Sequence, residues 1–447
     1  MARIKIVLLI VLILQNQFVA AQSGKEKNDT GATTKVPFDG YDLTWINGQN
    51  RQTDFPLVIR DKEGDDVATI TAFTDCYYNY NFNKPIDNTH TISSSIGRSN
   101  EFTFNMASLG IECNYHHAIG RLWLQYGQMA SIVSALDGSL NHGRNTSLSN
   151  LQYIREGAAG YHFDKLYGIN IEMGFFLSYM GLESYVLNEN WCYQRSLLCD
   201  LTPFYFSGAR VQAYLSKKFK TEIWLINGWQ TYNGWNSQIA VGGSNYYRPN
   251  TNLQLVANFY IAGHDVQNKP GLLRFHHDHS LAARYYDHKN KKGISQAAFS
   301  INNHYGFQTG DGVNAKDQYL LGTSIGNRIW FYHNKLAVTV RGDYVTNPGA
   351  YLAYSPSPVT NNAYTDAMNA RRILSQVQGV ATFDIMPTQF TTVRLEYGYR
   401  DSNLPYYAGP GGTTSPDGYI TTPVPTTWRP DLVRSDSRLT IAVTFRI

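Results

Sequence analysis

Apolar and polar residues alternate along the last stretch of the chain, residues 437–447. Leu439, Ile441 and Val443 lie on one face of an extended strand and Arg438 lies on the other, because successive side chains of a strand point to opposite sides. One face is therefore apolar, the other is largely polar, and the sequence ends inside the strand. This pattern is typical of the closing strand of a membrane β-barrel, which has lipid on one face and water on the other.

The same alternation recurs through most of the chain and predicts about sixteen strands. It is strongest in residues 168–180, 251–263 and 389–401, and weakest in residues 151–163 and 237–248. The predicted strands lie near residues 67–82, 101–115, 120–132, 151–163, 168–180, 203–215, 219–229, 237–248, 251–263, 278–288, 293–305, 317–332, 335–345, 373–385, 389–401 and 436–447.

Short and long connections alternate between these strands. The short ones lie at 117–120, 164–167, 216–218, 249–251, 289–292, 333–335 and 386–388. The long ones lie near 83–100, 133–150, 181–202, 230–236, 264–277, 306–316, 346–372 and 402–435. Outer-membrane barrels have short periplasmic turns and long extracellular loops. The sequence therefore predicts an all-β fold, a transmembrane antiparallel β-barrel of about sixteen strands.

Three segments divide the chain. Residues 1–21 have a basic start, a short apolar run and a small-residue cleavage site after Ala21, which together indicate a secretory signal peptide. Residues 22–66 begin polar and then carry apolar anchors without a sustained period. We expect them to form an N-terminal periplasmic or luminal segment, with a short extra strand as the alternative. Residues 67–447 form the predicted transmembrane β-barrel.

Composition agrees with this assignment. No uninterrupted apolar run after the signal is long enough for a membrane helix. Mean hydropathy is only −0.33, which a barrel explains because its strands alternate apolar and polar positions. The 32 tyrosines suit membrane interfaces, where the ring is apolar and the hydroxyl stays wet. Loss of Arg3 and Lys5 with the signal takes the 38 basic residues to 36, against 34 acidic residues, which gives no reason to expect nucleic-acid binding.

Five short stretches resemble the OmpL-like β-barrel porins of Gram-negative outer membranes. They are Thr74–Asn83, Leu201–Gly208, Ile226–Gln230, Val340–Tyr344 and Val393–Tyr397. The resemblance implies a diffusion channel in the outer membrane, with no catalytic residue and no cofactor. The partners it implies are outer-membrane lipid, the barrel assembly machinery and small hydrophilic solutes. Porins of this strand count are commonly trimers, so a homo-oligomer remains open.

Charged residues on the predicted inner face are candidates for lining the pore. In one interpretation they form a basic wall with a mild preference for anions. In the other they form ion pairs across the barrel that stiffen the lumen. These residues are Arg210, Arg341, Asp343, Arg394, Glu396, Arg400 and Arg438.

Cys192 and Cys199 flank six residues in the third long connection. In an exported protein this spacing permits a loop disulfide, which would reduce the freedom of the loop. By analogy with porins whose loops fold inward, the stapled loop is a candidate constriction of the pore.

No chemistry-bearing motif points to an enzyme. The run His276–His279 offers metal ligands by residue type, but neighbours on an extended chain point opposite ways, so we expect a solvated loop end and no metal site. No Gly-x-Ser-x-Gly motif is present. The sequence predicts a porin for passive diffusion of small hydrophilic solutes through a polar lumen. The alternatives are a closed barrel that acts as an adhesin or structural anchor through its surface loops, and a hydrolase with its site on the rim.

Overall fold

The computed structural model divides into two units, Met1–Lys35 and Val36–Ile447. It describes residues 35–447 except 91–94, 138–150, 234–238, 264–270 and 353. The predicted signal peptide and the polar residues 22–34 lie outside the described residues. The second unit contains the barrel.

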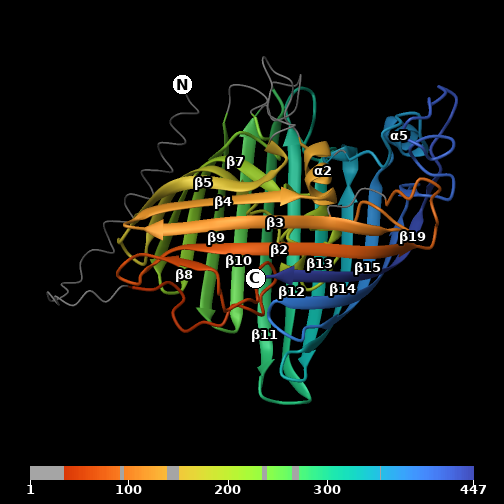
Figure 1. The fold of residues 1–447 in the computed structure, drawn as a ribbon. Coiled ribbons are helices and arrows are strands. Elements are labelled where there is room, and N and C mark those ends of the chain that lie inside the picture. The colour runs from red at the N-terminus through yellow and green to blue at the C-terminus, as the bar shows by residue number, and fades with distance from the viewer. Residues whose placement is uncertain (1–34, 91–94, 138–150, 234–238, 264–270, 353) are drawn as a thin grey trace. The chain divides into compact units, whose positions relative to one another are not determined.

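Sixteen long strands form one closed wall (Figure 1). Each pairs antiparallel with its neighbours in sequence, and β19 pairs with β2 to close the barrel. Closure leaves no unpaired sheet edge, which a wall surrounded by lipid requires. The predicted sixteen-strand antiparallel barrel is confirmed. The strands are β2 (Asp66–Asn81), β3 (Phe102–Tyr115), β4 (Ala118–Tyr126), β5 (Ile154–Phe163), β6 (Ile169–Leu177), β7 (Tyr205–Ser216), β8 (Phe219–Ile226), β9 (Ala240–Asn250), β10 (Leu253–Gly263), β11 (Leu273–Asp287), β12 (Ile294–Thr309), β13 (Tyr319–Phe331), β14 (Leu336–Asn347), β15 (Leu374–Ile385), β16 (Thr391–Ser402) and β19 (Ser435–Arg446).

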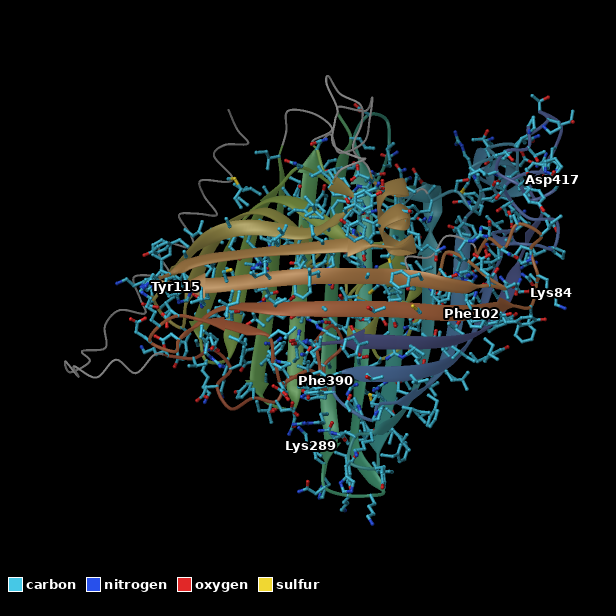
Figure 2. The ribbon with its side chains drawn as sticks, in the orientation of Figure 1. Lys84, Phe102, Tyr115, Lys289, Phe390 and Asp417 are labelled. Atoms are coloured by element: carbon cyan, nitrogen blue, oxygen red, sulfur yellow. The ribbon has the colours of Figure 1, made fainter. Side chains whose placement is uncertain are left out.

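Short turns and long loops alternate around the wall as predicted. Figure 2 labels Lys84, Phe102 and Asp417 at the long-loop end, and Tyr115 and Lys289 toward the short-turn end. The long loops carry the helices α2 (Gln128–Ala135), α4 (Leu197–Asp200) and α5 (Ala363–Asn369), the 3₁₀ turns η1 (Leu187–Glu189) and η2 (Pro348–Ala350), and the two-residue strands β17 (Tyr407–Ala408) and β18 (Leu432–Val433). In the part of the chain that the structure describes, no helix is long and apolar enough to cross a membrane.

The two faces of the wall carry the residues that the alternation assigned to them. Leu395 is 42% exposed on the outer face, as are Ile441 and Val443 to similar degrees. The neighbouring Arg394 and Thr440 are buried inside. Apolar side chains thus face lipid, and polar side chains face the interior.

Two predicted boundaries are wrong. The strand expected over 120–132 ends at Tyr126, because Gly127 adopts a positive φ of 104° that breaks the extended chain. The next residues form α2, which buries Met129 and Val133. The loop expected over 264–277 is also too long, since β11 already begins at Leu273.

The described residues before the barrel form an ordered segment and one short strand. Residues 36–54, which we call the N-terminal strap, bury Trp45 and Ile46 against interior side chains of the wall. Farther along, β1 (Val58–Arg60) adds a short strand beside β2, with Val58 opposite Thr69.

Candidate functional site

The interior of the barrel is crossed by the third long loop, residues 178–204. Its chain enters the lumen because its apolar side chains find partners there: Trp191, Tyr193 and Leu198 are buried among inward-facing residues of the wall. Within it, Ser196 caps the short helix α4 by accepting a hydrogen bond from the Cys199 amide. The loop is therefore an ordered element inside the barrel.

One side of the loop is fixed to strands β13–β16 and β19, which we call the covered wall. The backbone N–H groups of Tyr193 and Gln194 donate to the two carboxylate oxygens of Glu396, at 2.6 and 2.9 Å. Arg341 donates in return from Nη1 to the Gln194 carbonyl at 2.9 Å. Arg394 donates from Nη2 to the Asn190 carbonyl at 2.9 Å. These charge-assisted bonds fix the backbone of the loop against the wall.

The opposite side of the loop is fixed to β10 and β11. The Gly181 amide donates to Oδ2 of Asp278 at 2.8 Å, and Asn258 donates from Nδ2 to the Tyr179 carbonyl at 2.8 Å. Asn258 also bonds Asp278. The third loop therefore spans the lumen from β10–β11 to β14–β16 and divides it.

The structure turns all seven predicted pore-lining residues toward the interior, but it covers six of them. Glu396 and Arg438 are 0% and 1% exposed, because the third loop lies over the strands that carry them. The remaining residue, Arg210 on β7, keeps 12% of its side chain exposed. The six covered residues are Arg341, Asp343, Arg394, Glu396, Arg400 and Arg438.

Each of these arginines has an acidic partner. Arg341 pairs with Glu183 of the third loop at 2.8 Å, and Arg394 pairs with Asp384 at 2.6 Å. Arg438 pairs with Glu396 at 3.1 Å, Arg400 with Asp436 at 2.5 Å, and Arg210 with Glu172 at 2.7 Å. Of these five pairs, the Arg341–Glu183 pair holds the third loop to the wall, and the other four join neighbouring strands of the wall. None of the five crosses an open lumen.

A less covered wall lies on β4–β8, which we call the open wall. Its basic side chains keep some exposure: Arg121 on β4 keeps 25% of its side chain exposed and Lys220 on β8 keeps 14%, while their partners Glu172 and Glu222 are buried. Arg121 and Arg210 share the carboxylate of Glu172, and Arg121 also lies 3.7 Å from Glu156. The sequence analysis did not single out Arg121 or Glu156. The alternation of Arg121, Trp123 and Gln125 with Leu122 and Leu124 is the signal that could have found the first of them.

The N-terminal strap closes part of the short-turn end. Asp42 pairs with Arg284 at 2.7 Å and with Lys289 at 2.5 Å. At its other end Arg51 donates to the carbonyls of Thr388 and Thr391, at 2.7 and 2.8 Å. The strap also meets the third loop, since the Trp191 indole donates from Nε1 to the Trp45 carbonyl at 2.9 Å.

The predicted disulfide is wrong: Cys192 and Cys199 are free, buried thiols. Cys199 lies in α4 with its Sγ 3.7 Å from Asn302 Oδ1 on β12, whereas Cys192 lies beside Arg341 and Glu396 of the covered wall. The two thiols thus face different parts of the wall. Burial raises the pKa of each thiol to about 12, so both stay protonated at neutral pH in the folded barrel.

The interpretation of His276–His279 as a solvated loop end is also wrong. These residues belong to β11, and His276 is completely buried. Its Nε2 lies 3.0 Å from Nδ1 of His304 on β12, and its Nδ1 lies 3.1 Å from the Tyr351 hydroxyl. Among the described residues, no group of three or more His, Cys, Asp or Glu side chains could hold a metal ion.

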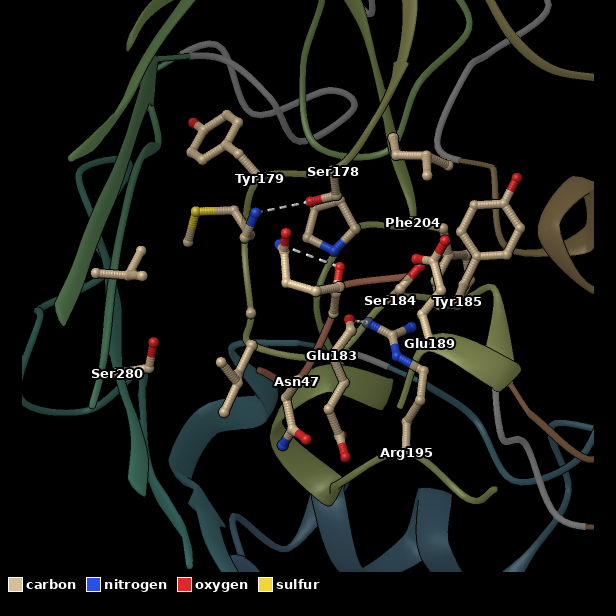
Figure 3. A pocket seen from close by; sticks show the side chains of 18 of the residues that line it. Asn47, Ser178, Tyr179, Glu183, Ser184, Tyr185, Glu189, Arg195, Phe204 and Ser280 are labelled. Carbon is tan, nitrogen blue, oxygen red and sulfur yellow. Dashed lines mark hydrogen bonds between the residues drawn. The ribbon is translucent and has the colours of Figure 1, made fainter. Parts of the chain in front are cut away.

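Two cavities remain beside the loop and the strap. The first, of about 150 Å³, lies between the third loop, Asn47–Gln49 of the strap and strands β9–β11 (Figure 3). The second, of about 140 Å³, lies on the other side of the strap, against Trp191 and the covered wall. Gln49 and Glu189 line both cavities. The interior thus keeps space next to the elements that divide it.

Comparison with known proteins identifies what this barrel is similar to. The model of the family described as "Putative beta-barrel porin-2, OmpL-like" matches residues 68–445. Comparison with the curated proteins gave no match.

Several solved outer-membrane structures share the fold. The outer membrane channel DcaP of Acinetobacter baumannii is 10% identical, with a TM-score of 0.50 over 88% of this chain and 100% of that one. The anion-selective porin from Comamonas acidovorans is 8% identical, with a TM-score of 0.51 over 85% of this chain and 99% of that one. OprB of Pseudomonas putida is 9% identical, with a TM-score of 0.50 over 85% and 94%. At these identities the likeness concerns the fold alone.

Proposed function

The chain belongs to the OmpL-like family of outer-membrane β-barrel porins, and from this premise we propose that small hydrophilic solutes diffuse passively along its open wall. The third long loop leaves this side of the lumen accessible and covers the other. Solutes entering there exchange part of their hydration for hydrogen bonds to the wall. Diffusion of this kind requires no cofactor and no catalytic residue.

The contrast in exposure between the two walls supports this route. Among the basic side chains, Arg121 on the open wall keeps 25% of its side chain exposed, whereas Arg341 and Arg438 on the covered wall keep 4% and 1%. A pore is lined by side chains that water reaches, so the path follows β4–β8 and not the strands that carry most of the predicted lining residues.

The paired charges of the open wall determine the expected ion preference. Arg121, Arg210 and Lys220 face three carboxylates, those of Glu156, Glu172 and Glu222, and Glu222 lies 2.8 Å from Lys220. Balanced pairs leave little net field for an ion to follow. The pore therefore passes both ions and neutral solutes, with weak selectivity.

Swelling of proteoliposomes in neutral sugars of increasing size tests the proposed route. Asn170→Trp adds a large side chain on the inward face of β6, where Asn170 now bonds Gln212 at 2.9 Å. The matched control is Ile171→Trp, one residue along the same strand on the exposed outer face. We expect Asn170→Trp to slow swelling and to lower the size limit, and Ile171→Trp to leave both unchanged.

Two results would contradict this proposal. Equal swelling of the two variants would place the path away from the open wall. Swelling no faster than that of protein-free liposomes would favour a closed barrel that acts through its surface loops.

A further inference from the structure

The cavity between the third loop, the strap and strands β9–β11 has the chemistry of a binding site. We infer that it binds a neutral, polyhydroxylated solute about the size of one six-membered ring. Its volume of about 150 Å³ sets an upper limit of one ring, because a cavity of roughly this volume holds a benzene-sized ring and the hydroxyl groups of a polyol fill the remaining space. The inference rests on the proposed pore function and names the class of solute that pauses inside it.

The two carboxylates that line the cavity, those of Glu183 and Glu189, are already paired within the protein. The Glu183 carboxylate pairs with Arg341 at 2.8 Å and accepts from the Ser196 amide at 2.6 Å. Glu189 pairs with Arg446 at 2.8 Å. A charged solute would bring an unpaired charge into this partly dry space or would have to break one of these pairs, and either event costs free energy. The cavity therefore favours a neutral solute.

Three neutral side chains on the cavity wall keep hydrogen-bonding capacity. Gln254 accepts from Arg248 Nε through Oε1 at 2.7 Å, which leaves its Nε2 without a partner among the described residues. Within the same described part of the chain, the Ser280 hydroxyl and the Asn47 Oδ1 atom also have no protein partner. Gln254, Ser280 and Asn47 are each more than nine-tenths buried. Polar groups in such surroundings are stabilised when a ligand bonds them.

The three side chains surround the cavity from different elements. Gln254 belongs to β10, Ser280 to β11 and Asn47 to the strap. Figure 3 shows Ser280 on the barrel wall, across the cavity from Asn47 and the third loop. An amide donor, an amide acceptor and a hydroxyl that can do both therefore converge on one space. Hydroxyl groups spread around a ring match this arrangement.

Aromatic rings supply the apolar part of the site. Tyr179, Tyr185 and Phe204 line the cavity. The two tyrosine hydroxyls are engaged elsewhere: Tyr179 donates to the Phe259 carbonyl at 2.9 Å and Tyr185 to Gln125 at 3.0 Å. The rings thus offer their apolar surfaces, which suit the C–H faces of a cyclic polyol.

Current block of single channels by D-glucose tests the site, with glucuronate as the anionic analogue of the same ring. We expect glucose to interrupt the current of the wild-type channel and glucuronate to do so at least tenfold more weakly. The double variant Gln254→Leu with Ser280→Ala removes two hydrogen-bonding groups and keeps the shape of the wall. It should weaken the glucose block roughly tenfold. Gln308→Leu is the matched control, because Gln308 is also a buried inward glutamine but lies on β12 outside the cavity.

The possible outcomes separate this inference from the proposed function. A conducting channel that glucose does not block, or that glucuronate blocks equally, would overturn the assigned site but not the pore. An unchanged block in the double variant would do the same. Absence of any conductance would contradict the pore. Calorimetry of glucose with the detergent-solubilised protein would then test the site: binding that Gln254→Leu weakens would support it, and no binding would overturn it.

Discussion

At the scale of single residues, the alternation of side chains along a strand separates residues that stabilise the barrel in lipid from residues that affect conduction. Leu395 and Arg394 are neighbours on β16, yet the first faces lipid and the second faces the interior. We expect Leu395→Arg to destabilise the barrel by roughly 2–4 kcal/mol, because it places a charge at lipid depth. Refolding into lipid vesicles, followed through denaturant titration, measures this loss.

Arg394→Gln is the control for that substitution. It removes a guanidinium from the interior, and Asp384 keeps Arg328 as a partner at 2.6 Å. The barrel should still assemble, with altered conductance because a contact to the third loop is lost. Intact assembly of Leu395→Arg with altered conductance would mean that the two faces are reversed.

Glu396 is the residue on which the position of the third loop depends most directly. Its carboxylate accepts two loop amides and pairs with Arg438. Glu396→Gln keeps the shape of the side chain but weakens these charge-assisted bonds. We expect larger and noisier single-channel currents, since the loop would leave the covered wall part of the time. Glu172→Gln, on the open wall, should instead shift the reversal potential toward anion preference. A shifted reversal potential in Glu396→Gln and noisier currents in Glu172→Gln would contradict the division of the lumen into a covered and an open wall.

Sequence alone predicted where most of these side chains point, but not what they touch. The period of two placed Arg341, Arg394 and Arg438 on the inner face. It could not reveal that a loop far away in sequence covers them, because that contact depends on the tertiary path of residues 178–204. For the same reason the spacing of Cys192 and Cys199 suggested a bond that their separate surroundings do not allow.

At the scale of elements, the third long loop should control how wide the pore is. Its two ends are close together, since Leu177 of β6 pairs with Tyr205 of β7. A short turn can therefore replace residues 182–201 without straining the wall. We expect this replacement to raise single-channel conductance severalfold. Shortening the exposed part of the last long loop, residues 416–424, is the control and should leave conductance unchanged; equal effects would remove the third loop from its proposed role.

The strap is held at the short-turn end by a carboxylate that responds to acid. Burial alone would raise the pKa of Asp42, but the hydrogen bond from Lys289 and those from Thr44 outweigh it and hold the pKa at about 2, below its ordinary 3.8. A lowered pKa in the folded state stabilises the docked strap above pH 3.8, and this contribution is lost as the pH falls toward 2. Loss of this contribution should raise the conductance as the pH falls below 3.8. Asp42→Asn should show the raised conductance already at neutral pH. A wild-type conductance that does not change in acid would contradict the role of Asp42 in holding the strap.

Elements inside the lumen were harder to predict than elements of the wall. The wall strands follow from a period that repeats sixteen times, and all sixteen were found, with the end of β4 and the start of β11 misplaced by five or six residues. The helix α2 was taken as an extension of β4, although Met129, Ile132 and Val133 have the i, i+3, i+4 spacing of a helix, because the run is only eight residues long and directly follows a strand pattern. His276 was placed in a loop because buried polar side chains break the alternation on which the strand assignment relied.

At the scale of the whole molecule, the protein is a closed barrel with a divided polar lumen, and it belongs to a porin family. The wall satisfies its own backbone hydrogen bonds and presents apolar side chains to lipid. The interior balances its charges in pairs, so the protein can keep a polar lumen without a strong field of either sign. Passive passage with weak ion selectivity is the behaviour expected of such a lumen.

Single-channel conductance of the purified, refolded protein in a planar bilayer, under a salt gradient, tests this account most directly. Discrete current steps with a small reversal potential are the predicted result, because the open wall passes ions of both signs and its charges are paired. A heat-modifiable barrel that inserts into the bilayer and gives no current steps would contradict the account. The third loop and the strap would then close the lumen completely, and the protein would act through its surface loops.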